Sequence, residues 1–159
     1  MKRFIILIIS FLCFTQAFSE EHLKFLGFPI DGTVNEYASK LMSKGFYISP
    51  DNKYASKGLR VMEGPFLENT ESFGLHYDTD TKKMYSVVFC HSFFKKEEAK
   101  ELYDKLESLL HEKHNEATYK SPLVGSFVSS CSFQSNKGII TLIIIEQDDD
   151  YQVKMSYTD

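Results

Sequence analysis

The spacing of apolar residues along the chain predicts two amphipathic helices. In the first, Val34 is followed by Tyr37, Ala38 and Leu41 at spacings of 3, 4 and 7, which places all four on one face of a helix. The second covers Lys95–His114 and has a longer apolar stripe with the same period. Glutamates crowd its first turns and basic residues close its last turn, an asymmetry that complements the helix dipole.

The first helix also has sequence signals at both ends. Thr33 and Glu36 match the S/T-x-x-E capping box, in which each side chain accepts a hydrogen bond from a backbone N–H of the first turn. Gly45 stands where a left-handed residue ends a helix. Phe46 can then pack back on Leu41, the contact that accompanies a Schellman motif.

Alternating apolar and polar residues predict strands over most of the remaining chain. Phe73, Leu75 and Tyr77 alternate with polar or small residues, as in a strand with one buried face. Turn-forming residues at 29–32, 78–83, 135–138 and 148–150 separate the segments. Tyr85–Phe93 is apolar on both faces, which predicts a central strand with cover on each side. The other expected strands are 22–28, Gly58–Leu67 with an interruption at Gly64-Pro65, Gly125–Gln134, Ile139–Ile145 and 151–157.

The order of these elements predicts an α+β fold. Two helices should pack on a mostly antiparallel sheet of about six to seven strands, because hairpins dominate the connections. Helix and antiparallel strands recur in the same order, which suggests two halves, although no residue-level repeat accompanies it.

Residues Met1–Ser19 have the features of an export signal. A basic start, Lys2-Arg3, precedes an apolar run at Phe4–Phe14, and small residues at positions 17 and 19 suit cleavage before Glu20. The run is too short for a comfortable membrane span, which needs roughly 20 residues, so a retained anchor is the less favoured alternative. We therefore expect cleavage to leave a single α+β domain at residues 20–159.

Export predicts a periplasmic or secreted protein. A lipoprotein is disfavoured, because Cys13 lies inside the apolar run and Leu12 stands where a small residue is needed. The whole chain has 18 basic and 22 acidic residues, and loss of Lys2 and Arg3 leaves 16 basic against 22 acidic, a net charge of −6. A net acidic chain without a basic cluster argues against nucleic acid and against anionic membrane surfaces as partners.

Two cysteines, Cys90 and Cys131, remain after cleavage. An oxidising compartment permits a disulfide between them. Nothing in the sequence shows that their strand faces meet, so two buried free cysteines that act as small hydrophobic residues are the alternative.

The histidines and acidic turns are the candidate ligands for a metal. His111 and His114 have an i,i+3 helical spacing that can bind a metal, but the sequence places no third ligand beside them, and a cationic helix end explains them equally. Oxygen ligands for calcium could come from Asp78 and Asp80 or from Asp148–Asp150, yet neither turn matches an EF-hand. The remaining histidines, His22, His76 and His91, are scattered in or beside strands. We predict no catalytic residue, metal or cofactor, since no nucleophile, zinc or phosphate-loop motif is present.

The start of the expected mature chain carries a resemblance. His22-Leu-Lys-Phe-Leu-Gly-Phe-Pro-Ile-Asp-Gly-Thr, followed by a capped helix ending Lys-Gly-Phe, resembles a group of small uncharacterised exported proteins of Bacteroides-type gut bacteria. Those proteins open with H-L-x-F-x-G-x-P-x-D-G, and the match covers residues 22–46. The resemblance implies a Gram-negative envelope or secreted location and brings no activity. The layout is also similar to exported inhibitors of the beta-lactamase-inhibitor type and to small outer-membrane assembly lipoproteins, as fold analogy alone.

These observations favour an exported, non-enzymatic binding module whose partner is a protein or an envelope component. Exposed tyrosines beside acidic turns, such as Tyr54 and Tyr151, are typical of contact surfaces. An inhibitor of a secreted hydrolase is the alternative. An enzyme with a dispersed site is a third reading, which a pocket that gathers His76, His91 or the acidic loops would support.

Overall fold

The computed structural model describes residues 22–50, 53, 55–114, 118–119 and 127–159. The expected signal Met1–Ser19 lies outside these residues, as do Tyr54 and the start of the predicted strand Gly125–Gln134. The described elements, in chain order, are β1 (Lys24–Phe25), β2 (Phe28–Pro29), α2 (Val34–Met42), β3 (Tyr47–Ile48), the 3₁₀ turn η2 (Ala55–Lys57), β4 (Leu59–Phe66), β5 (Asn69–Tyr77), β6 (Met84–Phe93), α3 (Lys96–Lys113), β7 (Thr118–Tyr119), β8 (Phe127–Ser135), β9 (Gly138–Gln147) and β10 (Asp150–Thr158).

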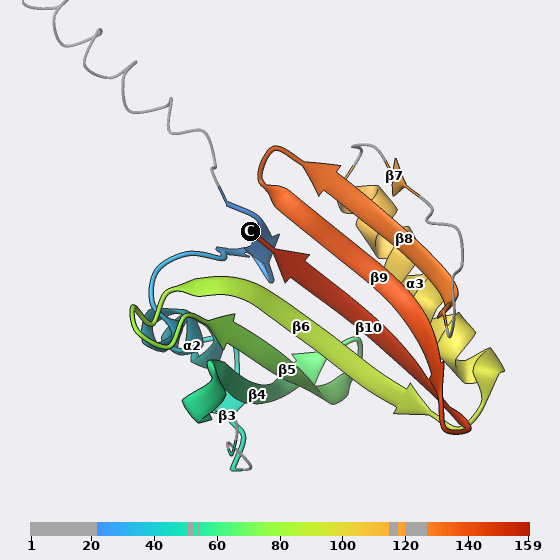
Figure 1. Ribbon diagram of the computed structural model, residues 1–159, viewed down its shortest axis with the longest axis horizontal. Helices are drawn as coiled ribbons and strands as arrows, with labels where there is room; N and C mark the ends of the chain where they lie inside the picture. Colours follow the sequence, from blue (N-terminus) through green and yellow to red (C-terminus); the bar gives the residue numbers. More distant parts are fainter. Residues whose placement is uncertain (1–21, 51–52, 54, 115–117, 120–126) are drawn as a thin grey trace, which may run out of the picture.

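The predicted α+β class is confirmed. β1 and β2 form a small hairpin, and the other strands form one sheet in the order β3-β4-β5-β6-β10-β9-β8-β7, in which every neighbouring pair is antiparallel (Figure 1). The last strand, β10, lies between β6 and β9 and therefore joins a sheet half that follows α2 to one that follows α3.

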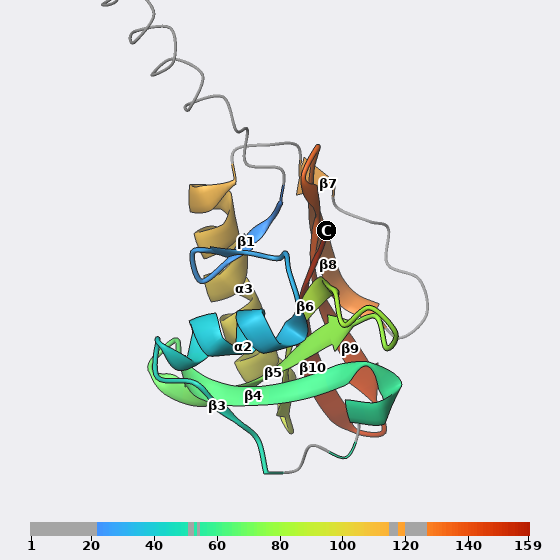
Figure 2. The same cartoon turned by 90° about the vertical axis from the view of Figure 1, so that its left-hand side faces the viewer.

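The helices and the β1–β2 hairpin cover the same face of the sheet (Figure 2). Alternate residues of β9 show the two faces: Ile140, Leu142 and Ile144 are buried, whereas Ile139 is 43% exposed. The other face, which is turned to the viewer in Figure 1, is called here the open face. β6 is central in the sheet, as predicted, but the expectation of cover on both sides is wrong for the described residues, because Cys90 on the open face is exposed.

Aromatic rings fill the covered face where the hairpin meets the sheet. Phe25 from β1 lies 5.0 Å from Phe73, measured between ring centroids, and Phe73 lies 5.2 Å from Phe66 and 5.7 Å from Phe89. Offset and edge-on ring pairs at such distances stabilise a core beyond their area burial, by about 0.5–1.5 kcal/mol each. The β1–β2 hairpin is thereby fixed to the sheet, although it shares no strand pairing with it.

Both ends of α2 have the geometry that the sequence predicts. The Glu36 N–H donates to the Thr33 hydroxyl at 3.3 Å, and the Thr33 N–H donates to the Glu36 carboxylate at 2.7 Å. The Thr33 N–H and the Thr33 hydroxyl both donate to the Glu36 carboxylate and lower its pKa, because they favour its charged form. At the other end Gly45 has a φ of 89°, and the Phe46 N–H donates to the Leu41 carbonyl at 3.3 Å, which is the Schellman pattern.

Three hairpins turn on two residues that both have positive φ. These pairs are Leu26-Gly27, Leu67-Glu68 and Asp148-Asp149, which connect β1 to β2, β4 to β5 and β9 to β10. Positive φ at both positions defines a type I′ turn, where asparagine and glycine are preferred. Leucine therefore occupies a strained backbone position at two of the three turns.

Candidate functional site

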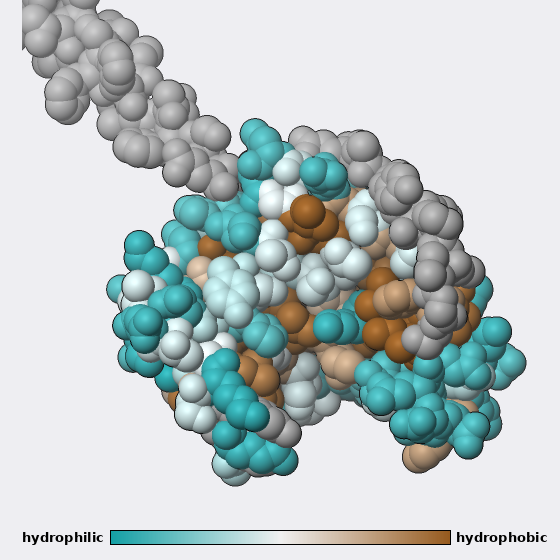
Figure 3. All heavy atoms as spheres, in the orientation of Figure 1, coloured by the Kyte–Doolittle hydropathy of each residue, from teal (hydrophilic) through white to brown (hydrophobic). Residues whose placement is uncertain are grey.

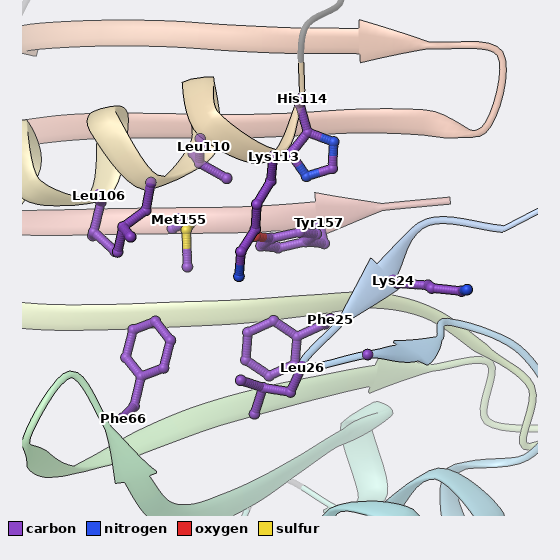
Figure 4. Close-up of a pocket in the computed structure, with 12 residues that line it drawn as sticks. Lys24, Phe25, Leu26, Phe66, Leu106, Leu110, Lys113, His114, Met155 and Tyr157 are labelled. Carbon is purple, nitrogen blue, oxygen red and sulfur yellow. The ribbon is translucent and has the colours of Figure 1, made fainter.

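A cavity of about 310 Å³ lies between the end of α3 and the β1–β2 hairpin; we call it the α3 pocket (Figure 4). Residues 24–27 of the hairpin form one wall and the last two turns of α3 the opposite one, through Leu106, Leu109 and Leu110. Met155 and Tyr157 of β10, with Phe66, complete the lining. Most lining side chains are apolar, as in the preformed concave sites that bind small molecules.

Two features of the sequence create this pocket. The apolar stripe of α3 is wide enough that Leu109 reaches the cavity beside Leu106 and Leu110, which pack on the sheet. The type I′ turn places Leu26 at the hairpin tip, where it is 37% exposed and faces the same cavity. A left-handed leucine costs about 1–2 kcal/mol relative to its ordinary conformation, so an apolar side chain is held here against a backbone preference.

The polar groups of the α3 pocket are basic or neutral. Lys24, Lys113 and His114 line it, and the lining contains no aspartate or glutamate. In Figure 4 the Lys113 side chain extends across the cavity, whereas the Lys24 ammonium points away from it. The pocket thus has a positive charge inside a chain whose formal net charge is −4.

Tyr157 contributes the other polar group of the α3 pocket. It is 8% exposed, and its ring meets that of Phe25 edge-on at 5.4 Å. Within the described part of the chain its hydroxyl has no hydrogen-bond partner. Burial raises the pKa of this phenol to about 12, because the interior disfavours its charged form, so the hydroxyl keeps its proton near neutral pH.

A second hollow, the His91 cleft, lies at the other end of α3 and has a volume of about 290 Å³. His91 Nδ1 lies 2.9 Å from a carboxylate oxygen of Glu71, whose side chain is only 10% exposed. The His91 ring also packs on Phe93, with 4.6 Å between centroids. From α3 the cleft receives Glu98, Glu101, Leu102 and Lys105. It offers an imidazole–carboxylate pair, and its lining holds no serine, threonine or cysteine nucleophile.

The open face has apolar and polar areas side by side (Figure 3). Phe127 is 41% exposed at one end of the β8–β9 pair, opposite Ile145, and Ile139 is 43% exposed at the other end, opposite Gln134. Lys154 and His76 add polar groups to this face. Partial burial lowers the pKa of His76, and the charge of Lys154 lowers it further.

The histidines that the sequence singled out do not meet. His111 and His114 pack on the Phe133 ring, at 5.0 and 6.4 Å between centroids, which explains their spacing without a metal. His22 Nδ1 instead pairs with the Asp159 carboxylate. Across the ranges that the structure describes, no group of three histidine, cysteine or acidic side chains could hold a metal ion.

The acidic turns have structural roles. Asp78 accepts hydrogen bonds from the backbone N–H groups of Asp80 and Thr81, at 3.1 and 2.7 Å, so it stabilises its own loop. These bonds lower the pKa of Asp78. Asp148 and Asp149 are the two turn residues between β9 and β10.

The two cysteines are both free, as in the second alternative, but the expected burial holds only for Cys131. Cys90 is exposed on β6 and Cys131 is buried on β8, with β10 and β9 between those strands. Three strand spacings separate them by roughly 14 Å, beyond the reach of a disulfide.

The sequence did not single out Lys113, Tyr157, Leu26 or Glu71 as functional. For Glu71 a signal existed, because it continues the alternation of Phe73, Leu75 and Tyr77 and so places a carboxylate on a buried face. For Lys113 and Tyr157 none existed, since their proximity depends on the pairing of β10 with the sheet beneath α3.

No helix in the described ranges is both long and apolar enough to span a bilayer. Comparison with protein-family models, with curated proteins and with solved structures finds no match for this chain.

Proposed function

We propose that this chain is an exported, non-enzymatic binding module that takes up a small apolar envelope component in the α3 pocket. The observation that supports the proposal is the pocket itself, a concave apolar site with a few polar groups on a fold whose other buried side chains pack closely. Its walls come from a helix, a sheet and the β1–β2 hairpin, which aromatic contacts fix to the sheet. Because these walls are already in place, binding needs little rearrangement.

Titration of the mature chain, residues 20–159, with 1-octanol tests the proposal. Chemical shifts should change at Leu26, Leu110 and Tyr157, with a dissociation constant of about 0.5 mM, or roughly −0.5 kcal/mol for each of the nine non-hydrogen atoms of this probe. Saturable shifts confined to the open face, or none at all, contradict the proposal.

The chain offers a matched pair of variants for this titration. Leu26→Asn removes an apolar wall of the pocket while asparagine suits the left-handed backbone there. Partial loss of one leucine contact, about 1 kcal/mol, should weaken octanol binding about fivefold. Leu67→Asn makes the same change at the equivalent turn position outside the α3 pocket and should leave binding unchanged. Equal effects of the two variants would mean that Leu26 acts through general stability.

The His91 cleft supports a second candidate, an enzyme with a dispersed site. An imidazole held by a buried carboxylate can act as a general base on water or on a substrate. A panel of chromogenic esters, glycosides and peptides, run with the wild-type chain and with His91→Gln, tests this candidate. Activity that disappears in the variant supports it, and activity that is absent or unchanged opposes it. The inhibitor alternative is tested with the same substrates and added hydrolases. It predicts that the chain slows the hydrolysis catalysed by at least one of them.

A further inference from the structure

We infer that the α3 pocket binds a free alkyl carboxylate of about eight carbons, whose carboxylate meets the Tyr157 hydroxyl and the Lys113 ammonium while its chain lies among the leucines of α3. This inference rests on the proposed function and specifies the ligand of the same site. Four observations carry it: an unpartnered hydroxyl on a buried side chain, a lysine across the cavity, the charge of the lining and the size of the cavity.

The Tyr157 hydroxyl indicates a ligand with a hydrogen-bond acceptor. Buried tyrosines normally donate to a partner, because an unpaired buried hydroxyl loses its bonds to water. The Tyr157 side chain is more than nine-tenths buried, and among the described residues its hydroxyl has no partner, but the oxygen itself is not fully buried and stays accessible at the α3 pocket. In Figure 4 its oxygen lies on the edge of the ring that faces Lys113. Its raised pKa keeps it a donor, so it suits an acceptor such as a carboxylate oxygen.

Lys113 indicates that the hydrogen-bond acceptor of the ligand is an anion. Within the described residues its ammonium forms no ion pair, and Figure 4 shows its side chain across the middle of the α3 pocket. The methylene groups of Lys113 are flexible and lie over apolar residues of the pocket. The ammonium can therefore move to an incoming anion while the methylene groups still cover those residues. Hydrogen bonds in which one partner is charged are about twice as strong as neutral ones.

The charged residues around the α3 pocket also favour an anionic ligand. The Lys113 ammonium extends across the cavity, the Lys24 ammonium points away from it, and the lining has no acidic residue, in a chain with more acidic than basic residues. One term opposes an anion, because the C-terminal end of α3 carries the negative pole of the helix dipole. The basic last turn of α3, with His111 and Lys113, offsets this pole.

The size of the cavity sets the length of the alkyl chain of the ligand. A volume of 310 Å³ divided by the roughly 30 Å³ that one water-sized group occupies in a liquid gives about ten non-hydrogen atoms. Octanoate has eight carbons and two oxygens and therefore matches, whereas a two-chain membrane lipid is far larger. We therefore choose a free acid in solution as the ligand, rather than a lipid held in a bilayer.

Calorimetric titration of residues 20–159 with three probes of equal chain length tests the inference. Octanoate should bind at least tenfold more tightly than 1-octanol, and octylamine should bind more weakly than either. Octanol that binds as well as octanoate overturns the charge assignment and leaves the proposed function standing. Tightest binding of octylamine would also overturn the charge assignment. It would mean that the carbonyl groups at the end of α3 bind the ammonium of the probe. Failure of all three probes refutes the proposed function together with the inference. Binding to phosphatidylglycerol vesicles in place of free octanoate likewise refutes the choice of a free acid.

Variants assign the contacts. Lys113→Gln should weaken octanoate about tenfold and change octanol less than twofold, because only the anion uses the ammonium. Tyr157→Phe should weaken octanoate by a similar factor while retaining the ring that packs on Phe25. Lys154→Gln, on the open face, is the matched control and should leave both affinities unchanged. If Lys113→Gln weakened the binding of octanol and octanoate equally, the lysine would act through packing. That result would overturn the inference that it recognises an anion.

Discussion

Gly64 of β4 lies beneath the Phe46 ring, and we predict that Gly64→Ala destabilises the protein through a direct clash. A Cβ at this position would lie 2.3 Å from Phe46 Cδ1, 2.4 Å from its Cγ and 2.9 Å from its Cα. Carbon atoms in contact are about 3.5–4.0 Å apart, so the ring must move by more than 1 Å. Phe46 is 4% exposed and packs edge-on against Phe73, with 5.6 Å between centroids, which leaves it no free space.

The expected cost follows from two opposing terms. Overpacking of a close-packed core costs about 1–3 kcal/mol, and the upper half of that range applies because backbone as well as ring atoms obstruct the new methyl. Replacement of glycine gains about 0.5–1 kcal/mol, since alanine has less conformational freedom in the unfolded chain. The net loss for Gly64→Ala should therefore be about 2 kcal/mol, a large share of an ordinary folding free energy of about 5–15 kcal/mol.

A double-mutant cycle measured by urea unfolding isolates the clash. Phe46→Ala alone should cost about 3–5 kcal/mol through the cavity that it leaves. In that background Gly64→Ala should cost close to nothing, because the obstructing ring is gone and the gain from replacing glycine offsets the remaining contact with the Cα at 2.9 Å. The coupling energy should then be about 2 kcal/mol, within the range for contacting residues. An equal cost of Gly64→Ala in both backgrounds would refute the reasoning.

Three further outcomes follow from local contacts. Thr33→Ala should lower the free energy of unfolding by about 1 kcal/mol, measured by urea unfolding, because it removes the hydroxyl that accepts the Glu36 N–H; no change would contradict the role of the cap. Glu68→Gly should raise it by about 1 kcal/mol, since glycine adopts the positive φ of 76° without strain; a loss would show that the exposed side chain contributes more than the turn. His76 should titrate by NMR below its ordinary pKa, and Lys154→Gln should move its pKa upward because a nearby positive charge is removed. Because the folded His76 has the lower pKa, its contribution lowers stability as the pH falls below about 6.5, where the unfolded chain takes up the proton first; a titration unaffected by Lys154→Gln would contradict this.

Local signals in the sequence predict most of the elements, because their causes are local. The capping pair at Thr33 and the glycine at position 45 fix the ends of α2 within a few residues. The alternation at Phe73–Tyr77 continues outward to Glu71 and the strand itself to Asn69, so β5 is longer than the sequence predicts. The predicted interruption at Gly64-Pro65 is wrong, because β4 runs unbroken from Leu59 to Phe66 and pairs with β5 throughout. The edge position predicted for Pro65 is confirmed, since β3 pairs with β4 only up to Glu63.

The strand order and the candidate site depend on contacts between distant residues. Nothing near β10 indicates that it pairs with β6, since 56 residues separate Phe93 from Asp150 and the choice depends on how whole faces fit. The α3 pocket exists only because that pairing brings Tyr157 beneath Lys113 and opposite the hairpin tip. The His91–Glu71 contact has the same origin, because it needs β5 and β6 in one register.

The central place of β10 has a consequence for biogenesis. A ribosome or a translocation channel delivers β4, β5 and β6 long before β10, so the backbone edge of β6 waits unpaired while the later strands are made. Unpaired edges recruit other chains, and distant pairings form slowly. A holding chaperone that masks the β6 edge should therefore raise the yield of native protein, and a stop codon before Asp150 should leave two half-sheets that aggregate.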